Sequence, residues 1–156
     1  AFQTCSPLEM LGHTLTHCGG RRVIATLHPK EDYITADCAA LEQLQKRFPK
    51  LTVSEGKMKH HLQHCSYVVT QNSSAAFAGY FFGKAALLFA EIDFHHIAVR
   101  ADLSTLAANF KAVAQARPEF DSYLWWFWQQ QSINAGKDDA RARILERFQR
   151  FGWPME

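Results

Sequence analysis

The strongest constraint on the fold is a regular alternation of short apolar segments with longer amphipathic ones through the first 100 residues. The apolar segments are residues 21–27, 51–54, 66–70 and 84–90, and their length and composition are typical of buried strands. The intervening segments 7–18, 34–47, 57–64 and 73–82 have the apolar spacing or the end signals of helices. This alternation predicts an α/β fold: a Rossmann-like parallel sheet with flanking helices.

The ends of the first helix are marked by their residue types. Ser6 suits the capping position, Pro7 the first helical position, and Gly19 with Gly20 the end. Beyond residue 100 only helical patterns follow, at 101–116, 119–131 and 138–151. We therefore predict one domain over residues 1–156, with an α/β core in 1–100 and an all-helical C-terminal extension in 101–156.

Composition excludes several classes of protein. The net charge of +2 is too small to predict nucleic acid as a partner, and no apolar run reaches the length of a membrane span. No secretory signal is visible, and the four cysteines lack CxxC spacing, so we expect reduced thiols in a cytoplasmic protein. A chain that begins with Ala1 rather than Met fits a processed protein or, better, a fragment.

The carboxyl ends of parallel strands should carry the ligand, because open α/β sheets bind ligands there. Ser73 and Ser74 follow the third strand, after Asn72, and precede small residues. Hydroxyls and free N–H groups at a helix start suit a phosphate. The alternative is that Ser73 or Asn72 only caps the helix.

A histidine ends the first strand and forms the second half of this candidate site. Pro29 restricts His28 to an extended backbone that would aim its ring, and Lys30 adds a cation. Alone, this is an ordinary strand-to-loop turn. Together, His28, Lys30 and the serines predict a phosphate site at one sheet edge.

The loop after the fourth strand holds several polar side chains. Glu91, Asp93 and His95 suit sugar or ribose hydroxyls, and we favour such contacts, or a solvated loop, over a metal. His60, His61 and His64 are interpreted as a surface helix rather than a zinc site. We expect no metal and no cofactor. A Ser-His-Asp hydrolase is disfavoured because Ser73 lacks the glycines of a nucleophile elbow.

The run SYVVTQNSSAAFAGYFFGKAALLFAEIDFHH, preceded by LHPKE, resembles the C-terminal half of GT-B glycosyltransferases of the capsule-polysaccharide group, Kdo- or sialyltransferase-like. The resemblance covers residues 21–100. It implies that His28, Ser73 and Ser74 contact the phosphate of a CMP- or UDP-linked sugar donor. It also implies that the acceptor-binding domain, which usually supplies the catalytic base, lies outside this chain. The family's glutamate after the serines is absent, since Phe77, Ala78 and Gly79 stand there.

An aromatic helix completes the sequence signals. Tyr123, Trp125, Trp126, Phe127 and Trp128 point in nearly all directions of a helix, which predicts either a buried central helix or an interface. The partner would be the N-terminal acceptor domain or a second copy; the resemblance is also compatible with peripheral membrane association of the parent protein. We expect a glycosyltransferase donor-binding domain acting in surface-polysaccharide synthesis. The alternative is a non-catalytic nucleotide-binding or assembly module.

Overall fold

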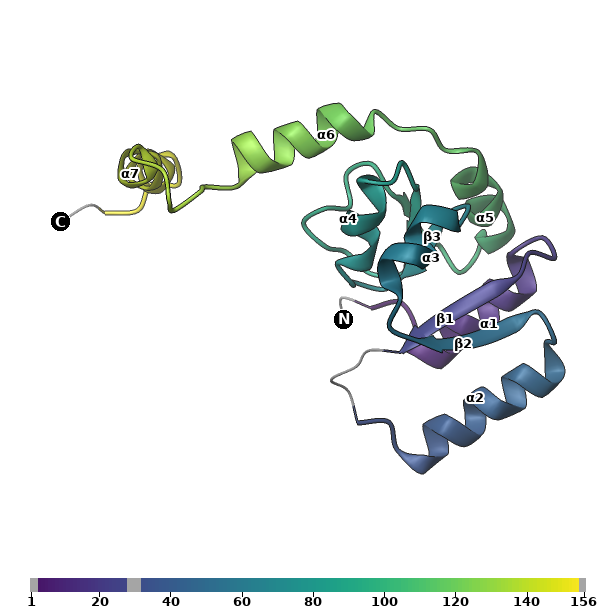
Figure 1. Ribbon diagram of the computed structural model, residues 1–156. Helices are drawn as coiled ribbons and strands as arrows, with labels where there is room; N and C mark the ends of the chain where they lie inside the picture. The colour runs from purple at the N-terminus through teal and green to yellow at the C-terminus, as the bar shows by residue number, and fades with distance from the viewer. Residues whose placement is uncertain (1–2, 28–31, 155–156) are drawn as a thin grey trace. The chain divides into compact units, whose positions relative to one another are not determined.

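The computed structural model describes residues 3–27 and 32–154 and has mixed α/β architecture (Figure 1). In this part of the chain the strands are β1 (Val23–Leu27), β2 (Leu51–Glu55), β3 (Val68–Thr70), β4 (Ala86–Leu88) and β5 (Val99–Arg100). The helices are α1 (Pro7–His17), α2 (Thr35–Arg47), α3 (Met58–His64), α4 (Ala75–Tyr80), α5 (Leu106–Gln115), α6 (Phe120–Trp126) and α7 (Ala140–Arg150), with a π-helical turn, Phe127–Gln131, continuing α6.

The strands form two short parallel sheets. β1 pairs with β2, and β3, β4 and β5 form a second sheet in that order. The expectation of one continuous sheet therefore differs from the described structure. Apolar patterning shows that a segment is extended and buried, but not which strand it pairs with, because the pattern is the same in either sheet. The two-residue β5 was not predicted, since so short a strand has no periodicity of its own.

The start of α1 confirms the sequence signals. Ser6 Oγ accepts the backbone N–H of Glu9 at 3.3 Å, and the Glu9 carboxylate accepts the N–H of Ser6 at 2.7 Å. This is a reciprocal capping box, which satisfies two N–H groups that a helix start leaves unpaired. The helix ends where Gly19 and Gly20 adopt positive φ, at 65° and 74°.

The chain divides into two compact units, the first ending at Pro118 and the second beginning at Glu119. The core of the first unit lies on β4, where Leu87, Leu88 and Phe89 are almost completely buried. α5 contacts β4 and β5, and its Phe110 and Val113 are buried. It thus belongs to the first unit, although its sequence places it in the predicted helical extension.

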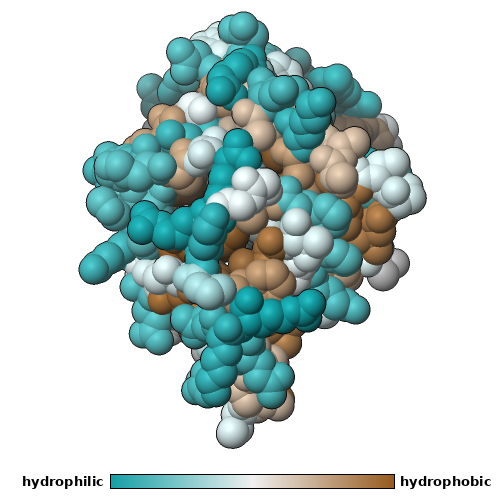
Figure 2. Space-filling view, turned by 90° about the vertical axis from the view of Figure 1, so that its right-hand side faces the viewer, coloured by the Kyte–Doolittle hydropathy of each residue, from teal (hydrophilic) through white to brown (hydrophobic). Residues whose placement is uncertain are grey.

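The two-stranded sheet is covered less completely. α1 contacts β1 and α2 contacts β2, but burial alternates along β1 and leaves Ile24 exposed. The side of the molecule shown in Figure 2 is mostly hydrophilic, with hydrophobic residues surfacing in separate patches. None of the described helices is long and apolar enough to cross a bilayer.

Candidate functional site

The carboxyl edge of the three-stranded sheet brings two polar segments together. Thr70, Leu88 and Arg100 occupy one row across the sheet, because Thr70 is in register with Leu88 and Leu88 with Arg100. Segments leaving β3, β4 and β5 therefore start from the same edge. This arrangement brings the serine segment, residues 71–74, and the segment 91–96 to one edge, as predicted from the sequence.

The serine segment has a buried end and an exposed end. Gln71 is buried, and its side-chain amide donates to the carbonyl of Cys5. Asn72, Ser73 and Ser74 are exposed. Ser73 donates its N–H to Thr70 Oγ1 at 3.4 Å, and Ser73 Oγ accepts the N–H of Ala75 at 3.2 Å. The segment is thus held in place by its own hydrogen bonds.

Ser73 Oγ caps the first N–H of α4, that of Ala75, but the N-cap position itself is Ser74, one residue after the Ser73 that the alternative interpretation predicted. The helix begins at Ala75 and has 6 residues, shorter than the predicted 73–82, so its dipole is small. The Ser73 hydroxyl proton is still available to a ligand, because capping uses only an oxygen lone pair. Ser74 makes no capping bond with its side chain. Any phosphate here would be bound by hydroxyl and backbone donors rather than by a long helix.

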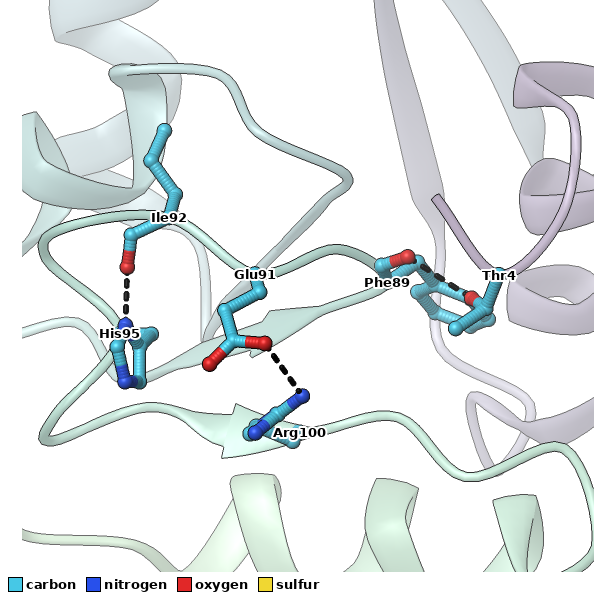
Figure 3. Close-up of polar contacts among 6 residues, drawn as sticks. All are labelled: Thr4, Phe89, Glu91, Ile92, His95 and Arg100. Atoms are coloured by element: carbon cyan, nitrogen blue, oxygen red, sulfur yellow. Dashed lines mark hydrogen bonds and ion pairs between the residues drawn. The ribbon is translucent and has the colours of Figure 1, made fainter. Parts of the chain in front are cut away.

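The N-terminal segment crosses the same edge, a contact that the sequence did not predict. Gln3 forms an antiparallel bridge with Ala90. The N–H and the hydroxyl of Thr4 both donate to the carbonyl of Phe89, at 3.0 and 2.8 Å (Figure 3). Together with the bond from Gln71 to Cys5, these contacts attach residues 3–5 to the ends of β3 and β4.

The loop after β4 is also fixed by specific contacts. Tyr80 Oη donates to the carbonyl of Phe94 at 3.1 Å, and His95 Nδ1 donates to the carbonyl of Ile92 (Figure 3). Asp93 is exposed in the same loop. The three predicted sugar or ribose contacts therefore share one loop, with His95 held by the backbone.

Arg100 is the site residue that sequence reasoning missed. Its Nη2 lies 3.3 Å from Glu91 Oε2, and the two side chains face each other across the ends of β4 and β5 (Figure 3). A pocket of about 320 Å³ is lined by Thr4, Leu88, Phe89, Ala90, Glu91, Arg100 and Ala101. The available signal was an arginine directly after the apolar residues 97–99, but only the strand pairing shows its place.

The carboxyl edge of the β1–β2 sheet contributes one contact between side chains. Ser54 Oγ lies 3.0 Å from His61 Nε2, which joins the end of β2 to α3. His28 and Lys30, with Pro29 and Glu31, lie outside the described residues. Whether His28 faces Ser73 therefore stays a prediction, and β1 and β3, the strands that precede these residues, belong to different sheets.

Two of the three histidines of α3, His60 and His64, contact each other. The rings of His60 and His64 are 4.5 Å apart, and His64 Nδ1 lies 2.8 Å from the carbonyl of His60. Among the residues that the structure describes, no three His, Cys, Asp or Glu side chains are grouped to hold a metal ion.

The aromatic helix lies in the second unit and is both buried and exposed. Tyr123 and Leu124 are buried, whereas Trp125 and Trp128 are 61% and 53% exposed. α7 supports its end, because Arg143 and Arg147 donate to the carbonyls of Gln129 and Gln130, each at 2.6 Å. Cations at the carboxyl end of a helix are favourable. The helix therefore has a buried part and an exposed part, and the interface stays a prediction.

Comparison of the chain with protein-family models, with curated proteins and with solved structures gave no match.

Proposed function

We propose that this chain is the donor-binding domain of a GT-B-type glycosyltransferase, with a Rossmann-like arrangement of its parallel strands. The observation that carries the proposal is the parallel order β3–β4–β5. It brings the exposed hydroxyls of Ser73 and Ser74 to the same carboxyl edge as Glu91, Asp93 and His95. Ligands of open α/β sheets bind at that edge.

The chemistry of this edge suits a nucleotide-activated sugar. Ser73 and Ser74 supply hydroxyl donors and Asn72 an amide for the donor phosphate, and His28 and Lys30 would add positive charge from the end of β1. Such donors stabilise the negative charge that develops on the leaving phosphate. Glu91 and Asp93 would accept hydrogen bonds from sugar or ribose hydroxyls, and His95 Nε2 would accept one more.

The reaction would be sugar transfer from a CMP- or UDP-linked donor in the synthesis of a surface or capsular polysaccharide, in the cytoplasm. An acceptor-binding domain outside this chain would supply the catalytic base, and the parent protein would associate peripherally with a membrane. These statements rest on the family resemblance. Neither a metal nor a cofactor is needed in this proposal, because hydroxyls and nearby cations stabilise the phosphate.

Nucleotide titration tests the proposal. CMP, CDP and UDP are titrated into the protein and the heat of binding is followed, first with the unchanged chain and then with Ser73→Ala/Ser74→Ala and with His28→Ala. We expect binding that weakens about tenfold or more in each variant, because hydrogen bonds to a charged group are lost. Ser66→Ala, an exposed serine at the amino end of β3, is the matched control and should bind normally.

Absence of nucleotide binding, or binding that ignores these substitutions, would contradict the proposal. Binding without sugar transfer by this chain alone agrees with a detached donor domain.

The exposure of Trp125 and Trp128 favours a second candidate, an assembly module that uses α6. Exposed aromatic patches mark interaction surfaces, and the partner would be the acceptor domain or a second copy. Sedimentation of the chain with and without Trp125→Ala/Trp128→Ala tests the second copy. A concentration-dependent dimer that disappears in the double variant supports it, and a monomer in both chains excludes it.

A further inference from the structure

We propose that Arg100 is an anion-binding residue for the phosphate of the nucleotide, and that Glu91 occupies its guanidinium when the ligand is absent. The inference rests on the proposed function in naming the nucleotide. The anion site itself is argued from the pocket at the carboxyl ends of β4 and β5.

The contact between Arg100 and Glu91 is weak. Both side chains are more than half exposed, and a single contact at 3.3 Å joins them. Exposed ion pairs of this kind add little stability because water screens them. The ion pair therefore adds little to the stability of the fold. A ligand phosphate can replace the Glu91 carboxylate on the Arg100 guanidinium at little cost.

The Arg100 guanidinium lies in a pocket that could hold an anion. The pocket that contains Arg100 is large enough for a small ligand, about 320 Å³, and Phe89 and Ala90 line part of it. The hydroxyl of Thr4 at its rim is already directed to the Phe89 carbonyl. Within this pocket lining, Arg100 is the one cationic side chain. A guanidinium with planar donors matches a phosphate better than a lysine does.

The register of the sheet places Arg100 and the serine segment on either side of β4. Thr70 and Arg100 flank Leu88 in the same row, so their backbones are about 10 Å apart at the usual strand spacing of ~4.8 Å. The serine segment begins one residue after Thr70. A ligand bound over the end of β4 thus has the serine hydroxyls on one side and Arg100 on the other. The serines and Arg100 would then contact the phosphate from opposite sides.

The test uses both partners of the ion pair, because a binding role and a structural role predict different signs. CDP, CMP and inorganic pyrophosphate are each titrated into the unchanged chain, Arg100→Met and Glu91→Gln. We expect Arg100→Met to weaken the binding of all three ligands about tenfold or more. Glu91→Gln should strengthen the binding of inorganic pyrophosphate, which has no ribose for Glu91 to contact, because a competing carboxylate is removed. Arg22→Met is the matched control, because Arg22 is an exposed arginine that precedes the amino end of β1 in the other sheet.

Each outcome decides between the two proposals. If nucleotides bind through the serines but ignore both Arg100→Met and Glu91→Gln, the Arg100 inference fails and the proposed function stands. If pyrophosphate binds through Arg100 while nucleotides do not bind, the anion site stands and the proposed function fails. If the two substitutions change the affinity for pyrophosphate in the same direction, or nothing binds, the inference is overturned. Unchanged thermal unfolding of both variants shows that the fold is retained.

Discussion

Tyr80 and Phe94 join α4 to the loop after β4 through one hydrogen bond, 3.1 Å from the Tyr80 hydroxyl to the Phe94 carbonyl. Both side chains are buried, at 1% and 7% exposure. The bond therefore fixes the loop that carries Glu91, Asp93 and His95 to the helix that follows the serine segment. The two halves of the candidate site are positioned relative to each other by this contact.

Removing the Tyr80 hydroxyl should make the loop more mobile without creating a cavity in the core. Tyr80→Phe should lower the free energy of unfolding by ~1 kcal/mol, because the buried carbonyl of Phe94 loses a donor while the ring remains. Hydrogen–deuterium exchange should increase in residues 91–97. Tyr67→Phe, just before β3, is the control and should not affect exchange in that loop. Equal exchange in the unchanged chain and in Tyr80→Phe would contradict the positioning role.

Two helical glycines should respond in opposite ways to the same substitution. A Cβ at Gly79 would lie 3.0 Å from Val68 Cγ2, whereas nothing lies within 4 Å of a Cβ at Gly12. Gly12→Ala should therefore stabilise the protein by ~0.5–1 kcal/mol through helix propensity. Gly79→Ala should destabilise it by roughly 1 kcal/mol, because crowding of α4 against β3 outweighs the same gain. Urea unfolding measures both. Stabilisation by Gly79→Ala would show that the contact at Val68 is unimportant, and destabilisation by Gly12→Ala would contradict the expected gain in helix propensity.

The sequence predicted the helices and strands of this chain better than the way in which they pair and pack. Strand positions, the cap at Ser6 and the end of α1 depend on neighbouring residues, and the structure confirms them. The separation into two sheets depends on contacts between distant segments. The bridge from Gln3 to Ala90 is of the same kind, since no local pattern connects residues 87 positions apart.

The candidate site was predicted in part for the same reason. Ser73 and Glu91 directly follow apolar strands, so their common edge follows from parallel topology. Arg100 was missed because β5 has 2 residues and no recognisable pattern. The Ser54–His61 contact was missed because it joins the end of a strand to a helix face whose orientation the sequence does not specify. Side-chain pairing of this kind becomes visible only when the packing is known.

The four cysteines should differ in reactivity according to burial. Cys38 is exposed on α2 and Cys18 is buried, while burial raises the pKa of the Cys5 and Cys65 thiols above the ordinary value. Because the thiolate is the reactive form, Cys38 should be labelled first by a maleimide near neutral pH, Cys5 and Cys65 more slowly, and Cys18 last. Peptide mass spectrometry gives the order, and Cys38→Ser should remove the fastest phase. Labelling of Cys18 as fast as that of Cys38 would contradict the burial of Cys18.

The capping box of α1 should make stability depend on pH in the acidic range. The hydrogen bond from the Ser6 N–H, and then that from the Ser6 hydroxyl, lower the pKa of the Glu9 carboxyl below its usual value of 4.5. A carboxyl whose pKa is lower in the folded state stabilises the protein fully above the unfolded pKa. That stabilisation is lost as the pH falls through the folded pKa. Stability should therefore decline on acidification below about 4.5.

Glu9→Gln separates this effect from the general loss of charge. Glutamine keeps an acceptor for the Ser6 N–H but does not titrate, so the variant should be less stable near neutral pH and should show a flatter stability profile below the pKa of Glu9. Glu42→Gln, which removes an exposed carboxylate from α2, is the matched control. Urea midpoints measured across the acidic range give the comparison. If Glu9→Gln loses stability on acidification as steeply as the unchanged chain, another carboxyl controls the transition and the capping box does not contribute to it.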